Sequence, residues 1–108
     1  MTLRQACMIL RVLGNAKRFQ ILELLLDGEK CTLELMDSFK VTQPTLSHDL
    51  KRLQTVGVIK PRKSGKRTYY SIDRDVLSDF IVFLKNSFEL FPEVEGSEYR
   101  LDVLAEEA

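Results

Sequence analysis

The chain has 108 residues, enough for one domain with a hydrophobic core of its own. Hydrophobic residues make up 44% and charged residues 30%, which is typical of a folded globular protein and excludes a disordered chain. No run of about 18 apolar residues is present, and residues 1–5 lack the pattern of a signal peptide, so we expect no membrane-spanning segment and no membrane partner. Two cysteines are too few for a disulfide framework, which favours a cytoplasmic protein with reduced thiols.

The formal net charge is zero, but the charges are segregated along the sequence. Residues 1–39 carry five basic and five acidic side chains, residues 40–70 carry eight basic and one acidic, and residues 71–108 carry three basic and ten acidic. The middle segment therefore predicts a positive surface, while the acidic segment keeps the chain soluble. Chance clustering is the alternative interpretation.

Two helices are predicted at the start of the chain. The first covers residues 3–13 and is apolar around most of its circumference, which is typical of a helix buried on two sides. One side can face the core and the other a second subunit. Gly14 and Asn15 end this helix and cap the next. The second helix runs from about residue 16 to 26, with Lys17, Arg18, Gln20 and Glu23 in solvent and with these residues in the core: Phe19, Ile21, Leu22, Leu24, Leu25 and Leu26.

A helix-turn-helix follows. Residues 27–30 form a turn, Thr32 caps a short helix over residues 33–39, and residues 40–41 connect it to a helix from Thr42 to about Val56. We expect the Thr42 hydroxyl to accept a backbone N–H at this helix start, with Pro44 in the first turn. One stripe of this helix is apolar, at spacings of four and three: Leu46, Leu50 and Leu53. The other faces carry groups suited to bases and phosphates: Gln43, Thr45, Ser47, His48, Lys51 and Arg52.

A basic hairpin comes next, with strands at residues 58–62 and 67–72 around a glycine-containing turn at 63–66. A recognition helix followed directly by such a hairpin predicts a fold that is mainly α with a small β-hairpin, a winged helix-turn-helix.

Residues 73–75 open a last helix over 76–91, which is more apolar than a small core requires. It is either a buried C-terminal helix or, as we prefer, a dimer interface shared with the first helix, with the set Leu3, Met8, Phe80, Ile81, Phe83, Leu84 and Phe88. We expect a domain over residues 1–91 and an acidic tail over 92–108, in which residues 99–104 could form a further short helix.

Several motifs resemble those of the ArsR/SmtB family of bacterial repressors. LGNAKRFQIL at residues 13–22 resembles the family's "L-(small)-(polar)-x-x-R-x-x-I-L" opening, and GEKCTLEL at 28–35 resembles "GELCVCDL". TQPTLSHDLKRL at 42–53 is similar to "SQPTVSRHLKxL", and GVI at 57–59 with RKSGKRTYY at 62–70 is similar to "GLV…RREGRxxYY". The resemblance covers residues 3–91. It implies five helices with a hairpin before the last one, a homodimer, a fourth helix that enters the major groove of an imperfect palindrome, and repression that an inducer relieves.

The metal sites of that family are incomplete here. Metalloid-sensing members have two cysteines two residues apart, where this chain has Cys31 and Leu33, and Met36 stands where some have a third thiol. Zinc-sensing members bind the metal between the last helices with histidine and carboxylate ligands, but the one histidine here, His48, lies on the recognition helix and the last helix has none. We therefore predict no metal site and no cofactor. Cys7 and Cys31 remain candidate sensor thiols, and the alternative is that both are ordinary structural residues.

The predicted function is a repressor that binds double-stranded operator DNA as a homodimer, with an unknown inducer. Base edges would be contacted by Gln43, Thr45, Ser47 and His48, and phosphates by Thr42, Lys51 and Arg52. Lys63, Lys66 and Arg67 on the wing would hold the flanking backbone or reach the minor groove. The alternatives are a redox- or thiophilic-ion-sensing repressor and a winged-helix module for protein or RNA. No enzyme motif is present, so we expect no catalytic activity.

Overall fold

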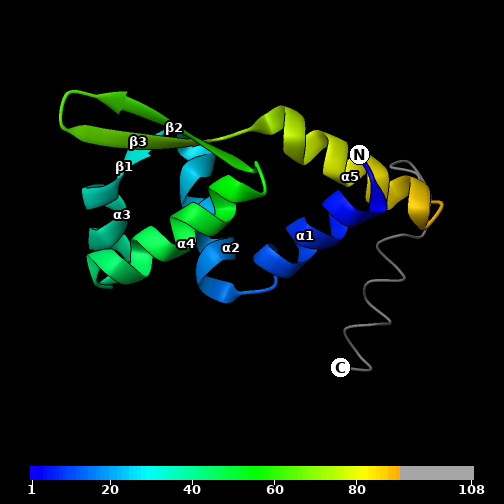
Figure 1. The fold of residues 1–108 in the computed structure, drawn as a ribbon, viewed down its shortest axis with the longest axis horizontal. Helices are drawn as coiled ribbons and strands as arrows, with labels where there is room; N and C mark the ends of the chain where they lie inside the picture. The colour runs from blue at the N-terminus through cyan, green and yellow to red at the C-terminus, as the bar shows by residue number, and fades with distance from the viewer. Residues whose placement is uncertain (91–108) are drawn as a thin grey trace.

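The computed structural model describes residues 1–90, and the predicted tail and its short helix lie outside these residues. The elements are α1 (Leu3–Leu13), α2 (Ala16–Leu24), the 3₁₀ turn η1 (Leu25–Asp27), β1 (Lys30–Cys31), α3 (Thr32–Phe39), α4 (Gln43–Thr55), β2 (Ile59–Ser64), β3 (Arg67–Ile72) and α5 (Arg74–Ser87). Figure 1 labels the α-helices and the strands. The predicted winged helix-turn-helix is confirmed. The strand β1 was not predicted, because a two-residue strand leaves no periodicity in the sequence.

Local capping explains where the first helices begin and end. The Thr2 hydroxyl accepts from the Gln5 N–H at 3.1 Å while the Gln5 side chain accepts from the Thr2 N–H, which makes a capping box for α1. Gly14 ends α1, and the Asn15 side chain caps α2 by accepting from the Arg18 N–H at 3.2 Å, as predicted. The predicted extension of α2 to residue 26 is wrong, since the chain tightens into η1 after Leu24.

The α3–α4 connection is a three-residue turn. Lys40 adopts the left-handed conformation, with φ 53° and ψ 40°, and its N–H donates to the Met36 carbonyl at 2.8 Å. Thr42 is the N-cap of α4, as predicted, but its hydroxyl makes no bond to the backbone. The N-cap of α3 is Cys31 rather than the predicted Thr32, and its N–H donates to the Glu34 carboxylate at 3.1 Å.

The sheet has the order β1-β3-β2, and both pairings are antiparallel. The β2–β3 hairpin is longer and its turn tighter than predicted, because Ser64 pairs with Arg67 and only Gly65 and Lys66 form the loop. Gly65 has φ 63°, as the first position of a type II′ turn requires. Pro61, which cannot donate to a ladder, is accommodated because β2 is an edge strand.

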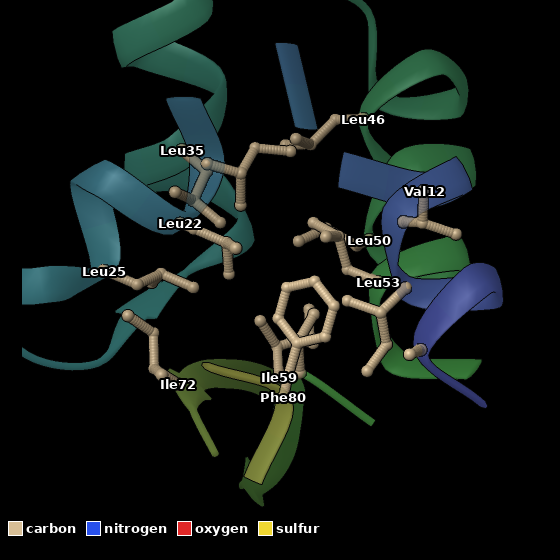
Figure 2. Close-up of a cluster of buried hydrophobic side chains, with 14 residues drawn as sticks. Val12, Leu22, Leu25, Leu35, Leu46, Leu50, Leu53, Ile59, Ile72 and Phe80 are labelled. Carbon is tan, nitrogen blue, oxygen red and sulfur yellow. The ribbon is translucent and has the colours of Figure 1, made fainter. Parts of the chain in front are cut away.

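The core joins all five helices to the sheet. Leu46, Leu50 and Leu53 of α4 are fully buried, as their spacing predicted, and Figure 2 shows them pointing into a cluster with Val12, Ile59 and Phe80. Ile21, Leu22 and Leu25 are buried too, whereas the predicted core positions Phe19 and Leu26 are exposed. Apolar spacing alone did not reveal that these two side chains are exposed.

The molecule is elongated. Its principal dimensions are 49 × 31 × 23 Å, and its radius of gyration is 16.2 Å, compared with about 13 Å for a compact domain of 100 residues. In Figure 1, α2, α3, α4 and the sheet form one end, while α1 and α5 extend toward the other. The extended end carries several exposed apolar side chains that nothing in the described part of the chain covers: Leu3, Met8, Leu10, Ile81, Val82, Phe88 and Leu90.

Candidate nucleic-acid interface

Every side chain that the sequence assigns to DNA is exposed. These side chains lie at the start of α4, in its middle and on the hairpin: Thr42, Gln43, Thr45, Ser47, His48, Lys51, Arg52, Lys63, Lys66 and Arg67. Since α4 buries Leu46, Leu50 and Leu53, its 3.6-residue period turns the opposite face, with Ser47 and His48, to the solvent. The helix therefore presents a polar and cationic surface over its whole length.

The two threonines at the start of α4 bond to each other. The Thr42 hydroxyl donates to the Thr45 hydroxyl at 3.0 Å, which replaces the predicted N-cap bond to the backbone. The Thr42 side chain therefore accepts no hydrogen bond from the N–H groups of the first helical turn. Such groups, at the positive end of a helix, are suited to a phosphate oxygen.

Gln43 lies beside the wing. It lines a hollow of about 310 Å³ together with Lys66, Arg67 and Thr68 of the hairpin, and residues of the α3 start complete the lining: Cys31, Thr32, Leu33 and Met36. The structure thus brings together one candidate base-reading group and two candidate phosphate-binding cations, which are separated by more than twenty positions in the sequence.

The second half of the α4 surface faces α1. His48, Lys51 and Arg52 line a groove of about 480 Å³ whose other wall comes from α1, with Met8, Arg11 and Val12. Arg11 was not among the predicted site residues. Its sequence position, on an apolar helix far from the basic segment, carried no signal that it would join the cations of α4.

The one acidic side chain of residues 40–70 is buried. Asp49 is 8% exposed, and its carboxylate accepts from the Arg18 guanidinium at 3.3 Å. The Arg18 Nε donates at 2.6 Å to the carbonyl of Val12, in the last turn of α1. Arg18, predicted to lie in solvent, therefore links α1, α2 and α4. Because Asp49 is buried, no carboxylate of α4 offsets the positive charge of its exposed surface.

A second ion pair anchors the base of the wing. The Arg62 guanidinium donates to the Glu29 carboxylate, with 3.0 Å between Arg62 Nε and the carboxylate oxygen, and lies 4.9 Å from the centroid of the Tyr69 ring. The hydrogen bond from Arg62 lowers the pKa of Glu29, and the N–H of Cys31 lowers the pKa of Glu34. Arg62 is thus engaged within the chain, whereas Lys63, Lys66 and Arg67 at the tip have no ion-pair partner among residues 1–90.

Comparison with known proteins agrees with this geometry. Residues 15–60 match the family described as "Bacterial regulatory protein, arsR family". The chain is 36% identical over 81 residues to the arsenical resistance operon repressor of Staphylococcus aureus, covering 75% of this chain and 78% of the relative. The chain belongs to the ArsR family.

Two further similarities concern assembly and regulation. The ArsR-family chain is 30% identical to the transcriptional repressor SdpR of Bacillus subtilis, over 72% of this chain and 87% of the relative. Its fold matches the solution structure of the homodimeric winged helix-turn-helix DNA-binding domain Mb0332 of Mycobacterium bovis, with a TM-score of 0.67, 31% identity, and coverage of 81% of this chain and 82% of that one.

The predicted dimer residues fall into three classes in this ArsR-family fold. Leu3 and Met8 of α1, Ile81 of α5 and the C-cap residue Phe88 are exposed, while Phe83 and Leu84 are half-buried against the core. The assignment of Phe80 to a dimer surface is wrong, because its ring is 4% exposed and packs into the core of the single chain (Figure 2). Apolar periodicity marks which residues are buried but not by which chain.

The two thiols lie in different surroundings. Cys7 is exposed on α1, and Cys31 is buried at the start of α3. Leu33, at the position of the family's second metalloid thiolate, is an exposed side chain without a donor atom. Within residues 1–90 no three His, Cys, Asp or Glu side chains are grouped so that they could hold a metal ion. These residues do not fit the metalloid site of the family.

None of the helices in the described part of the chain combines the length and apolar character needed to cross a bilayer.

Proposed function

We propose that this ArsR-family regulator represses transcription by binding an operator as a homodimer, with α4 of each protomer in the major groove and the β2–β3 wing on the flanking backbone. The observation that carries the proposal is the exposed surface from Thr42 to Arg52 and on to Lys66 and Arg67, from which Asp49, the one acidic side chain of residues 40–70, is withdrawn. A major groove is wide enough to admit such a helix.

The side chains divide by chemistry. Gln43, with both a donor and an acceptor, and Ser47 and His48 on the solvent face are assigned to base edges. Thr42 and Thr45, whose hydroxyls are already paired, contribute their remaining acceptor or donor capacity at the helix start. The cations are assigned to phosphates: Lys51, Arg52, Lys63, Lys66 and Arg67.

The remaining assignments follow from this role. A regulator of operator DNA acts in the cytoplasm and needs no catalytic group, and no cofactor is assigned. A protein- or RNA-binding winged helix is the competing function. The exposed amide, hydroxyls and cations along one helix favour double-stranded DNA, since the major groove displays a distinct set of donors and acceptors for each base pair.

The deciding experiment is a mobility-shift titration with duplex DNA from upstream of the protein's own gene, at several salt concentrations. We expect a complex of two protomers per duplex that is at least about 10³-fold tighter than the complex with unrelated DNA. Equal affinity for both duplexes, or tighter binding to RNA of the same sequence, would refute the proposal.

Wing and helix substitutions should have different signatures. Lys66→Ala or Arg67→Ala is expected to weaken binding to every duplex and to reduce the slope of log K against log salt by about 0.9, because each loses one phosphate contact. Gln43→Ala should instead cost roughly 1–3 kcal/mol at one base position and relax the preference there. Binding isotherms on a set of single-base operator variants measure both. The same profile for both classes of variant would contradict the assignment.

The thiols provide a separate test of the inducer. Because serine is a favourable N-cap and Cys31 already holds that position, we expect Cys31→Ser to fold and bind DNA as the wild type does. The measurement is DNA release by As(III), Cd(II) and a persulfide donor, with Cys7→Ser as the matched variant. We expect no release at stoichiometric reagent, since the thiols lack further ligands. Release by the wild type that disappears in Cys31→Ser would instead identify a thiol-based sensor.

A further inference from the structure

The groove between α1 and α4 combines two kinds of lining. Met8 and Val12 of α1 and Val56 at the end of α4 supply apolar surface. Three cations stand around it, Arg11, Lys51 and Arg52, together with His48 and Thr55. The volume of about 480 Å³ lies within the range of sites that hold small organic ligands.

The charges of this groove are not neutralised within the described part of the chain. No Asp or Glu of residues 1–90 lines the groove. The ion pairs in those residues are Arg18–Asp49 and Arg62–Glu29, so neither of them involves Arg11, Lys51 or Arg52. The nearest acid in sequence, Asp49, is turned inward to Arg18. The groove therefore has a net positive charge to be satisfied from outside.

We propose that this groove binds a small organic anion with a flat apolar body, of the class of aromatic carboxylates and sulfonates. Arg11 would contact the anionic group from the α1 side and Lys51 or Arg52 from the α4 side, while the ring lies against Met8, Val12 and Val56. A DNA phosphate alone would use the cations but leave this apolar surface in water, whereas an amphipathic anion satisfies both.

Such a ligand would affect DNA binding because of where the groove lies, an inference that rests on the proposed function. Lys51 and Arg52 are assigned to DNA phosphates, so an anion held between α1 and α4 competes for the same cations. By thermodynamic linkage, a ligand that weakens operator binding is itself bound less tightly by the DNA complex. The groove would thus act as an inducer site that needs neither a metal nor a thiol.

The probe for the test is 8-anilino-1-naphthalenesulfonate, whose fluorescence rises in an apolar site, and the uncharged N-phenyl-1-naphthylamine is the matched control ligand. We expect the full-length protein to bind the anionic probe at least about tenfold more tightly than the neutral one, the ratio for one charge-assisted contact. Arg11→Gln should weaken the anionic probe about tenfold, and Thr55→Phe, which fills the groove, should do so at least as much. The control variants Arg4→Gln and Gln54→Phe lie on the same helices outside the groove and should change affinity less than about twofold.

The second readout is DNA. Saturating anionic probe is expected to weaken operator binding by roughly fivefold or more in the wild type and to have no effect in Thr55→Phe. Three results would overturn the site: equal binding of both probes, unchanged probe affinity in Arg11→Gln and Thr55→Phe, or no probe binding at all. The last result is expected if a second copy of the chain covers the groove. Absence of operator binding with normal probe binding would instead refute the proposed function and leave the anion site standing.

Discussion

Replacing Ile81 by glutamate is expected to convert the protein to monomers and to weaken operator binding by about 10²–10⁴-fold, because a palindrome is then bound by one half-site contact instead of two linked ones. Ile81 is exposed in the single chain, so the substitution leaves the core of the protomer intact. In the dimer it would bury a charge without a partner. Sedimentation velocity gives the assembly state, and a mobility-shift titration gives the affinity.

Two other positions on α5 are the controls for this result. Asn86→Glu adds the same charge at an exposed polar position and should leave both the dimer and the affinity unchanged. Phe80→Ala should act on the protomer instead, lowering the free energy of unfolding by about 3–5 kcal/mol, since the ring is in the core. If Ile81→Glu remained dimeric and bound the operator normally, the assignment of the α1–α5 surface to the dimer would be wrong.

The second large effect is expected at the Arg18–Asp49 pair. Arg18→Ala should lower the free energy of unfolding by roughly 3 kcal/mol, because it leaves the Asp49 carboxylate buried without its partner and removes the bond to the Val12 carbonyl. Both side chains are more than four-fifths buried, at 13% and 12% exposed, so solvent screens this pair only weakly. Urea denaturation followed by circular dichroism measures the change.

A double-mutant cycle separates the pair from its surroundings. Asp49→Ala should cost less than Arg18→Ala, since Arg18 keeps the Val12 carbonyl, and the double variant should be little worse than Arg18→Ala alone. The exposed pair Arg62–Glu29 is the matched control, and its removal should change the stability little. Strictly additive effects of Arg18→Ala and Asp49→Ala would show that the two side chains do not interact.

Sequence patterns predicted the elements whose signals are local. The Leu46, Leu50 and Leu53 spacing is enough to orient α4, because a helix that buries one stripe must expose the opposite one. Asn15 and Gly14 likewise marked a helix boundary through groups that act within a few residues. The predictions failed where distant segments meet: the two-residue β1 exists through its pairing with β3, and the Arg18 side chain leaves the solvent to pair with Asp49.

By itself, therefore, the sequence determined the winged helix-turn-helix, the exposed face of α4 and the basic wing, since each depends on residue spacing, capping and turn chemistry within single elements and the turns that join them. Only the tertiary structure decided that Phe80 belongs to the core while Ile81 remains outside it, and that Arg11 joins Lys51 and Arg52 around one groove. The physical reason is that hydrophobicity and charge specify what a side chain needs, namely burial or a counter-charge. Which other segment supplies it depends on how the helices pack.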